Sequence, residues 1–324
     1  MGRFQRELPA DHAARVRRAE ASLDGLSVGD AFGERFFGDV DVIRARIAAR
    51  TLPRPTWDTT DETELAFAIV QVLDRYGRID QDALADRFAD RYQADPARGY
   101  GATVHGILRA IGEGMPWRRV VREPFEGLGS MGNGAASRAG VVGAYFADDL
   151  ETVVAEARAS AEVTHAHPEG QAGAIAVAVA AATAWRMRKA PKRDALFEAV
   201  LRYTPEGDTA RGIAQAAQLA PNASIDFAVR KLGNGAQTLS ADTVPLALFC
   251  AARHLDDYVE ALWSTVSAQG DRDTLCAIVG SIVCLCAPAI PSAWLLSREP
   301  IGDRVPDSYH LTLVTGRSTP PAED

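Results

Sequence analysis

Apolar residues recur every three or four positions along most of this chain, which is the spacing of amphipathic helices. In residues 61–77, Leu65, Ile69 and Leu73 fall on one face of such a helix, and Gly77 follows as a helix-ending residue. The same periodicity predicts helices over 80–93, 102–114, 135–146, 150–164, 170–188, 192–203, 207–219, 243–255, 256–268 and 273–287. The pattern therefore predicts an all-α protein.

One segment departs from the helical pattern: residues 309–316 alternate between apolar and polar side chains, as a short strand does. No strong repeat and no Gly/Ser-rich linker divides the chain, and the loops with candidate functional residues are spread between residues 24 and 274. A site built from all of these loops requires one folded unit. We therefore predict a single compact domain over residues 1–324, with roughly ten to fifteen helices of ordinary length.

Composition narrows the class of protein. Of the 324 residues, 47% are hydrophobic and 24% are charged, which is typical of a soluble globular protein. The formal net charge of −8 argues against direct nucleic-acid binding, because affinity for the phosphate backbone needs clustered Lys and Arg. The longest apolar run, residues 172–185, is rich in alanine and shorter than a membrane span, so we interpret it as a buried core helix.

The N-terminal residues lack the apolar core of a signal peptide, which predicts a cytoplasmic protein without membrane association. Cys250, Cys276, Cys284 and Cys286 have neither C-x-x-C nor zinc-finger spacing, so we interpret them as reduced core cysteines. No exposed apolar stripe is left over after the helices are placed, and we expect a monomer.

Two clusters of acidic and hydroxyl side chains stand directly before apolar helical segments. The first cluster is Thr60, Asp61 and Glu62, and the second is Asp271, Asp273 and Thr274. Oxygen ligands without nearby Cys or His suit a hard cation such as Mg²⁺ or Mn²⁺, and two such clusters brought together could clamp two ions. The alternative is that these residues only cap their helices and offset the helix dipoles. The residues themselves leave both interpretations open.

A glycine-rich stretch, "GLGSMGNGAASRAG" at residues 127–140, is the third candidate. Its glycines would let the backbone approach a ligand closely, Ser130 and Asn133 offer hydrogen bonds, and the predicted helix that follows could hold phosphate at its N-terminus. It is neither a Walker loop nor a dinucleotide-binding fingerprint, because no G-K-[ST] follows it and no strand precedes it. The alternative is a simple turn between helices.

Two further polar residues stand out. Asp30 lies in the apolar, glycine-flanked segment 24–38, where a buried carboxylate requires a polar partner. The neighbouring glycines themselves are explained equally well by close helix packing. His165 ends one predicted helix just before Pro168 opens the next, and it could donate a hydrogen bond to a phosphate or a ribose. A lone histidine at a helix end is also a common cap.

Taken in order, these stretches resemble the ADP-ribosylglycohydrolase family. Its signatures are matched by Gly29-Asp30-Ala31-Phe32-Gly33, Thr60-Asp61-Glu62-Thr63, Gly132-Asn133-Gly134-Ala135, Thr164-His165 and Gly270-Asp271-Arg272-Asp273-Thr274, with further similar segments at 98–104 and 242–251. The resemblance spans about residues 20–295, which leaves 296–324 as a C-terminal extension of the core. Each motif is weak alone, but five in the family's order are a strong signal.

The resemblance implies an orthogonally packed helical bundle with a binuclear Mg²⁺ or Mn²⁺ centre at the base of a cleft for ADP-ribose. It implies hydrolysis of the glycosidic bond between ADP-ribose and a protein side chain such as arginine, or a small conjugate. ADP-ribose or an ADP-ribosylated protein would then be the partner. The implied metal ligands are Thr60, Asp61, Glu62, Asp271, Asp273 and Thr274. The implied catalytic acids are Asp61, Glu62 and Asp30, and the implied substrate-binding residues are Ser130, Gly132, Asn133, Gly134, Ala135, His165 and Tyr100.

Three positions depart from the family pattern. Glu62 stands where the family has Asp, Phe37 stands where many members have an acid, and Arg272 replaces a small or hydroxyl residue. These departures favour one alternative, a family member that binds ADP-ribose without turnover, as a sensor or an immunity-type binder. A second alternative is a structural, crystallin-like member, which would bind no metal.

Overall fold

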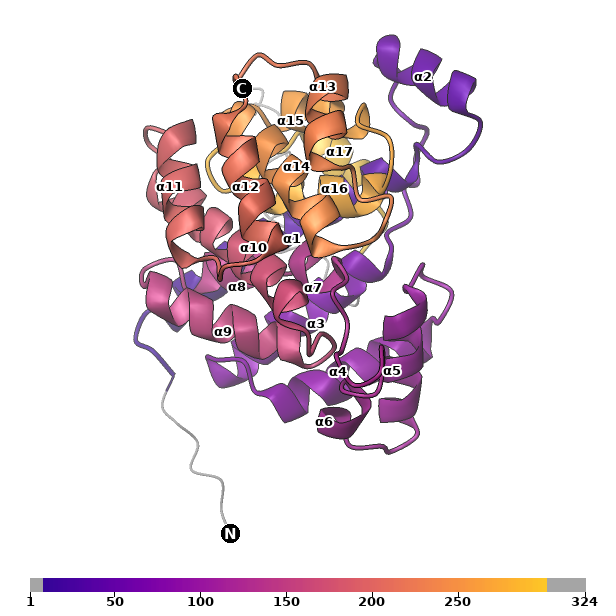
Figure 1. The fold of residues 1–324 in the computed structure, drawn as a ribbon, viewed down its shortest axis with the longest axis vertical. Helices are drawn as coiled ribbons and strands as arrows, with labels where there is room; N and C mark the ends of the chain where they lie inside the picture. The colour runs from indigo at the N-terminus through magenta and orange to yellow at the C-terminus, as the bar shows by residue number, and fades with distance from the viewer. Residues whose placement is uncertain (1–7, 302–324) are drawn as a thin grey trace, which may run out of the picture.

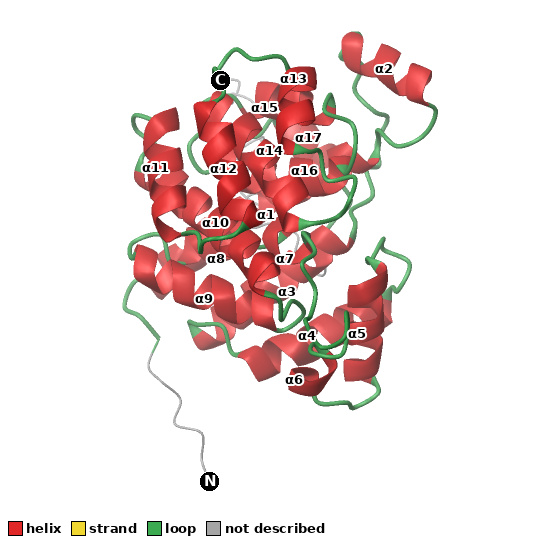
Figure 2. Ribbon diagram, viewed as in Figure 1, coloured by secondary structure: helices red, strands yellow, loops and turns green. Residues whose placement is uncertain are grey.

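The computed structural model describes residues 8–301, and the strand predicted at 309–316 lies outside them. Seventeen helical segments follow one another in the described residues, and most loops between them are short (Figures 1 and 2). Two longer loops precede α3 and α7. The predicted all-α fold is confirmed. In the part of the chain that the structure describes, β pairing is limited to two isolated bridges, one of which joins Gly132 to Leu239.

The helices are α1 (His12–Glu34), α2 (Val40–Ala48), α3 (Asp61–Tyr76), α4 (Gln81–Ala94), α5 (Ala102–Gly112), α6 (Trp117–Val120), α7 (Gly134–Ser137), α8 (Gly140–Tyr145), α9 (Leu150–Glu162), α10 (Pro168–Arg186), α11 (Arg193–Tyr203), α12 (Asp208–Gln218), α13 (Ile225–Leu232), α14 (Ser240–Arg253), α15 (Tyr258–Val266), α16 (Arg272–Val283) and α17 (Ser292–Ser297). The longer helices that periodicity predicts are present within a few residues of the predicted bounds. The segment 135–146, predicted as one helix, is instead divided into α7 and α8 at Arg138 and Ala139.

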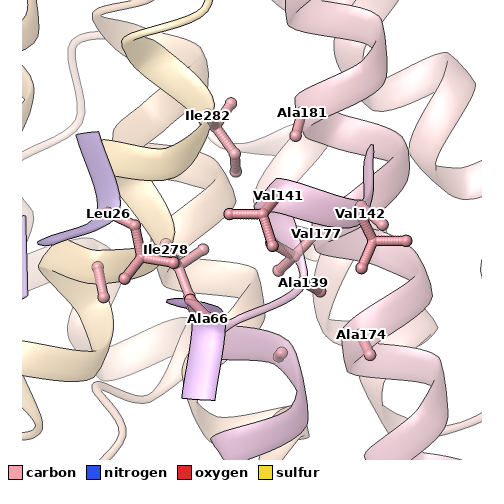
Figure 3. Packing of buried hydrophobic residues seen from close by; sticks show 14 of the residues in the cluster. Leu26, Ala66, Ala139, Val141, Val142, Ala174, Val177, Ala181, Ile278 and Ile282 are labelled. Atoms are coloured by element: carbon pink, nitrogen blue, oxygen red, sulfur yellow. The ribbon is translucent and has the colours of Figure 1, made fainter. Parts of the chain in front are cut away.

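The core is formed where α1, α3, α8, α10 and α16 meet. Figure 3 shows Leu26 of α1, Val141 of α8, Val177 of α10 and Ile278 of α16 pointing toward one another. Almost every residue of α10 between Gly170 and Ala184 is buried, so the apolar run at 172–185 is a core helix, as predicted. None of the helices in the described residues combines the length and apolar character needed to cross a lipid bilayer.

Glycines on α1 allow it to lie directly against α16. A Cβ on Gly29 would stand 2.1 Å from the carbonyl oxygen of Cys276, and one on Gly33 would stand 2.4 Å from that of Arg272. This backbone-to-backbone approach explains why α1 gives no amphipathic stripe in the sequence, since its second half is buried on all sides. It also places Asp30 of α1 beside the N-terminus of α16.

The four cysteines carry no disulfide, and Cys250 and Cys276 are fully buried, as expected for reduced core cysteines. Cys284 and Cys286 are partly buried and pack against the core. The helix α2 differs from the rest of the fold. It projects from the body of the molecule in Figure 1, and Ile43 is its buried residue.

Candidate active site

A cavity of about 320 Å³ opens where the loops before α3, α5, α7, α10 and α16 converge. This volume is in the range of small-molecule binding sites. Among the residues predicted for the site, those that line the cavity are Asp61, Glu62, Ser130, Gly132, Asn133, Gly134, His165, Asp271, Asp273 and Thr274. The two acidic clusters, 212 residues apart in the case of Glu62 and Thr274, therefore belong to one site.

Asp30 holds the start of α3 from behind the cavity. Its carboxylate accepts hydrogen bonds from the backbone N–H and hydroxyl of Thr60, at 2.9 and 2.8 Å, and from those of Thr63, at 3.3 and 2.5 Å. Burial, followed by the neighbouring charge of Asp273, raises the pKa of Asp30 to about 7. The buried carboxylate thus has the polar partners that its setting requires, and it orients the helix that carries Asp61 and Glu62.

Thr60 begins α3 as its N-cap, since its hydroxyl oxygen accepts a hydrogen bond from the Glu62 N–H at 3.3 Å. Its own hydroxyl proton goes to Asp30, so Thr60 is not among the residues lining the cavity. The first acidic cluster is therefore a helix cap, while Asp61 and Glu62 still reach the cavity. The first turn of α3 therefore both caps the helix through Thr60 and places Asp61 and Glu62 at the cavity.

Glu62 joins the two acidic clusters. One of its carboxylate oxygens accepts a hydrogen bond from the Thr274 hydroxyl at 2.6 Å, and the other accepts one from the hydroxyl of Ser137. Burial and the nearby charges of Asp61 and Asp273 raise the pKa of Glu62 well above its ordinary range. The Glu62 side chain is longer than the Asp of the family pattern, and the hydroxyl groups of Ser137 in α7 and Thr274 in α16 hold its carboxylate in place.

The second cluster is fixed by the glycine-rich loop. The side-chain amide of Asn133 donates to Asp271 at 2.7 Å and to the hydroxyl of Thr243 at 2.9 Å. Burial and the adjacent Asp273 raise the pKa of Asp271 to about 8. One oxygen of Asp273, Oδ1, is buried without a hydrogen-bond partner. Buried carboxylates in this state strongly favour a cation, a proton or a hydrogen-bond donor beside them.

The donor set fits a hard cation in its chemistry. Asp61, Glu62, Asp271, Asp273 and Thr274 offer only oxygen atoms, and Asp273 Oδ1 has no protein partner. Among residues 8–301, however, no group of three or more His, Cys, Asp or Glu side chains is arranged so that it could hold a metal ion. Cation binding by this set therefore requires the carboxylate side chains to turn toward the ion, whose charge would offset their mutual repulsion.

Arg272, one of the three departures from the family pattern, is directed away from the cavity. Its guanidinium lies over the ring of Phe37, 5.6 Å from the ring centre, and neither residue is among those lining the cavity. Arg272 and Phe37, two of the three positions that depart from the family pattern, therefore contact each other next to the loop between α1 and α2. The carboxylates of Asp271 and Asp273 point elsewhere, into the cavity.

The loop of residues 130–134 lines the cavity with the backbone of Gly132 and Gly134 and with the hydroxyl of Ser130. The N–H of Gly132 donates to Ser130 Oγ at 3.1 Å, and the N–H of Asn133 donates to the carbonyl of Thr238 at 3.0 Å. These two N–H groups are already used, whereas Ser130 Oγ acts only as an acceptor within the loop and keeps its proton for a ligand. The helix that follows, α7, is only four residues long, which differs from the long helix predicted there.

Two predicted substrate-binding residues lie outside the cavity lining. Ala135 is buried in α7, and Tyr100 packs edge-on against Tyr92 with ring centres 5.1 Å apart. The Tyr100 hydroxyl is buried without a hydrogen-bond partner. Its neighbours in the same loop and helix line the cavity instead. They belong to the family-like segment 98–104 but were not predicted as site residues: Gly99, Gly101, Ala102, Thr103 and Val104. Thr238 also lines the cavity, and no sequence signal pointed to it.

A salt bridge from the C-terminal extension holds this wall against α3. Glu299 accepts hydrogen bonds from the Thr59 N–H at 2.7 Å, from the Thr59 hydroxyl at 2.6 Å and from the guanidinium of Arg98. The carbonyl of Arg98 in turn accepts the N–H of Asp61 at 2.7 Å. Glu299 thus supports the wall of the site, although the motifs end before it.

Changing Glu299 to alanine is expected to lower the free energy of unfolding by about 1–2 kcal/mol, because three hydrogen bonds to a carboxylate are lost together. Thermal unfolding measures the effect. Glu113→Ala is the matched control, since Glu113 is an exposed glutamate 3.9 Å from Arg109, and it should change stability by less than about 0.5 kcal/mol. Equal effects of the two substitutions would show that the Glu299 contacts do not hold the wall.

An all-α fold with several carboxylates lining one cavity is compatible with a hydrolase that acts on glycosidic bonds, since such enzymes use pairs of carboxyl groups. A family model described as ADP-ribosylglycohydrolase matches residues 11–315. The chain belongs to the ADP-ribosylglycohydrolase family. This confirms the predicted family and the predicted enzyme class, and the match includes Glu299.

Individual relatives agree with the family match. The chain is 31% identical to ADP-ribosylhydrolase ARH3 of Xenopus tropicalis over 89% of this chain and 92% of the relative. It is also 31% identical to ADP-ribosylhydrolase ARH3 of Homo sapiens, over 74% of each chain. A solved structure titled "ADP-ribosylglycohydrolase-related protein complex" is similar with a TM-score of 0.62 and 22% identity, covering 88% of this chain and 93% of that one. This structural likeness supports the fold.

Proposed function

We propose that this protein hydrolyses the glycosidic bond of ADP-ribose conjugates in the 320 Å³ cavity, with Mg²⁺ or Mn²⁺ as cofactor. The substrate would be an ADP-ribosylated protein side chain such as arginine, or a small conjugate. One observation carries the proposal: the two acidic clusters of the family pattern meet in one cavity, joined by the hydrogen bond from Thr274 to Glu62. The family membership supplies the chemical class of substrate.

The cation would be held by Asp61, Glu62, Asp271, Asp273 and Thr274, where it would orient ribose hydroxyls and lower the pKa of water. Thr60 would contribute by capping α3. The chain's own acids perform the remaining work. Glycosidic cleavage passes through an oxocarbenium-like state, which a nearby carboxylate stabilises and which needs a base for the attacking water. Asp61 is one of the carboxylates that line the cavity, and we assign to it the role of accepting and returning that proton.

Ligand positioning falls to the walls of the cavity. The glycines at 132 and 134 let a bulky diphosphate approach the backbone, and the Ser130 hydroxyl offers it a hydrogen bond. On the opposite wall, the loop of Gly99 and Gly101 presents a similarly open surface beside Asp61. A ligand held between the two walls would place its reactive ribose over the carboxylates.

Addition of excess chelator is expected to stop release of ADP-ribose from an ADP-ribosylated arginine protein, and added Mg²⁺ or Mn²⁺ should restore it. Release is measured by chromatography of free ADP-ribose with and without the metal. K⁺ at matched ionic strength serves as the control, because a monovalent ion interacts less strongly with clustered carboxylates. Undiminished turnover in excess chelator would overturn the metal-dependent mechanism while leaving the hydrolase intact.

A second function, binding of ADP-ribose without turnover, is favoured by one observation. Both carboxylate oxygens of Glu62 are already hydrogen-bonded, to Ser137 and to Thr274, which leaves Glu62 less available to a cation. Calorimetry with Mg²⁺ and then ADP-ribose, run beside assays on arginine-linked and small conjugates, separates the two. Tight binding of ADP-ribose without its release from any conjugate would contradict the proposed hydrolase and support ADP-ribose binding without turnover.

A further inference from the structure

Arg138 is a fully buried cation at the break between α7 and α8. Its Nη2 donates to the hydroxyl oxygen of Thr164 at 2.7 Å and, more weakly, to the carbonyl of Ser160 at 3.4 Å. The guanidinium also lies over the ring of Phe88, 4.5 Å from its centre. Among the described residues no carboxylate lies within ion-pair distance of Arg138; the ion pairs found there involve other arginines and His12. The charge of Arg138 interacts at longer range with Glu62 and Asp61, and its short hydrogen bond is the one to Thr164.

The bond from Arg138 determines which way the Thr164 proton points. A guanidinium only donates, so Thr164 Oγ1 is the acceptor in that contact. Thr164 is fully buried, and the one other partner that the described residues offer its hydroxyl is Nδ1 of His165, at 2.7 Å. A protonated Nδ1 would leave the buried hydroxyl proton without an acceptor, so Thr164 is the donor in this contact. Donation from Thr164 requires Nδ1 to be an unprotonated acceptor. In a neutral imidazole, the proton must therefore be on Nε2.

The protonated nitrogen faces the candidate site. His165 lines the cavity, and its Nε2 is 3.2 Å from the position that a Cβ on Gly132 would occupy. Gly132 belongs to the same cavity wall. The ring thus turns Nδ1 toward the buried Thr164 and Nε2 toward the glycine loop. Any side chain at position 132 would obstruct Nε2. Access to Nε2 therefore explains the glycine at this position, independently of turn geometry.

We propose that Arg138 and Thr164 form a relay that fixes His165 as the neutral tautomer with its proton on Nε2, so that His165 donates a hydrogen bond to an oxygen of the ligand. Arg138 and Thr164 are positioning residues in this scheme, and His165 is the contact. The identity of that oxygen as part of ADP-ribose rests on the proposed function. The relay itself rests only on the hydrogen bonds of the protein.

Electrostatics support the same assignment. Burial, followed by the positive charge of Arg138, lowers the pKa of His165 to about 3, so the ring stays neutral at physiological pH. A neutral donor can bind an acceptor oxygen but does not serve as a proton source for the reaction. The relay therefore separates binding by His165 from proton transfer by the carboxylates.

The tautomer can be observed directly in the unliganded protein. With ¹⁵N-labelled histidine, long-range ¹H–¹⁵N correlation spectra at neutral pH distinguish a protonated Nε2 from a protonated Nδ1, and the His165→Gln variant assigns the signal. The expected spectrum of the wild-type protein shows Nε2 protonated and Nδ1 unprotonated. A proton on Nδ1 in the wild-type spectrum, or an equal mixture of the two tautomers, would overturn the relay.

Two substitutions of Thr164 test the consequence for binding. Thr164→Val keeps the shape but removes the hydroxyl, so we expect tautomer mixing and roughly fivefold to tenfold weaker binding of ADP-ribose. Thr164→Ser keeps the hydroxyl and should retain the wild-type tautomer, with affinity within about twofold. Circular dichroism and thermal unfolding establish that both variants are folded. An unchanged tautomer and affinity in Thr164→Val would refute the positioning role.

The tautomer measurement separates failure of the relay from failure of the proposed function. If wild-type protein shows Nε2 protonated but does not bind ADP-ribose by calorimetry, with or without Mg²⁺, the relay is supported and the proposed ligand is wrong. If ADP-ribose binds but Nδ1 carries the proton, the relay is wrong and the proposed function stands.

Discussion

Replacing Asp61 with asparagine is expected to abolish hydrolysis and, in the presence of chelator, to make the protein more stable to heat. Burial, and after it the charges of Asp30 and Asp273, raises the pKa of Asp61 well above its ordinary range. The ionised group therefore destabilises the metal-free fold, and a neutral amide of the same shape removes that repulsion. We expect a gain of about 1–2 kcal/mol in the free energy of unfolding, with a loss of at least about 10²-fold in turnover.

The sign of the effect is visible in its pH dependence. Between about pH 4 and pH 8, folded Asp271, with its pKa raised to about 8, binds more proton than the unfolded chain does. The free energy of unfolding of the chelated wild-type protein should therefore fall as pH rises through this window. In Asp61→Asn the slope should be shallower, because one member of the repelling cluster has been neutralised.

Differential scanning calorimetry in excess chelator measures the stability of both proteins. The control is Asp58→Asn, an exposed aspartate of the same segment with a weak contact to Arg35 at 3.9 Å, whose stability should change by less than about 0.5 kcal/mol. A lower melting temperature for Asp61→Asn than for wild type would show that the carboxylates are not in mutual repulsion. If the proposed function is right, adding Mg²⁺ should reverse the ranking, since an ion bound by the intact acidic cluster would stabilise the wild-type protein.

The acidic side of the site was predictable because its signals are local. Asp and Thr before an apolar run mark a helix start, and the periodicity after Asp61 and after Asp271 marks the helices themselves. The family pattern then supplied the pairing of these two distant helix starts, which no local signal contains. The structure adds the physical link, which is the bond from Thr274 to Glu62.

Residues that support the site from behind were not predictable in the same way. Arg138 and Glu299 act through partners 26 and 201 or more residues away along the chain, and neither stands in a pattern that sets it apart from a surface charge. Asp30 was singled out because a carboxylate between glycines was conspicuous, but its partners on α3 could not be named. Long-range hydrogen bonds of buried polar groups are fixed by packing, which the sequence encodes only collectively.

The same reasoning separates two roles inside the motif at residues 29–33. Asp30 bonds to α3, whereas Gly29 and Gly33 face the backbone of α16. The glycines therefore set the distance between α1 and α16, and this distance sets where Asp30 meets α3 and where Asp273 stands relative to it. The motif is a packing device that also carries one carboxylate, and its glycines need no ligand to explain them.

Substituting Gly29 with alanine is consequently expected to be among the most damaging single changes in the chain. The new Cβ would stand 2.1 Å from the carbonyl oxygen of Cys276, a backbone atom that no rotamer change can move. Separating α1 from α16 to relieve this clash opens the centre of the core, so we expect a loss of about 3 kcal/mol or more. Turnover should fall as well, because Asp30 moves with α1 and releases Thr60 and Thr63.

Gly106→Ala is the matched control for this prediction, because Gly106 also lies in a helix but a Cβ there meets nothing within 4 Å. It should be neutral or stabilising by up to about 1 kcal/mol, through the better helix propensity of alanine. Urea unfolding of the two variants beside wild type gives the comparison. If Gly29→Ala is as stable as Gly106→Ala, then α1 and α16 are not in backbone contact. The explanation of how Asp30 is positioned would then also be wrong.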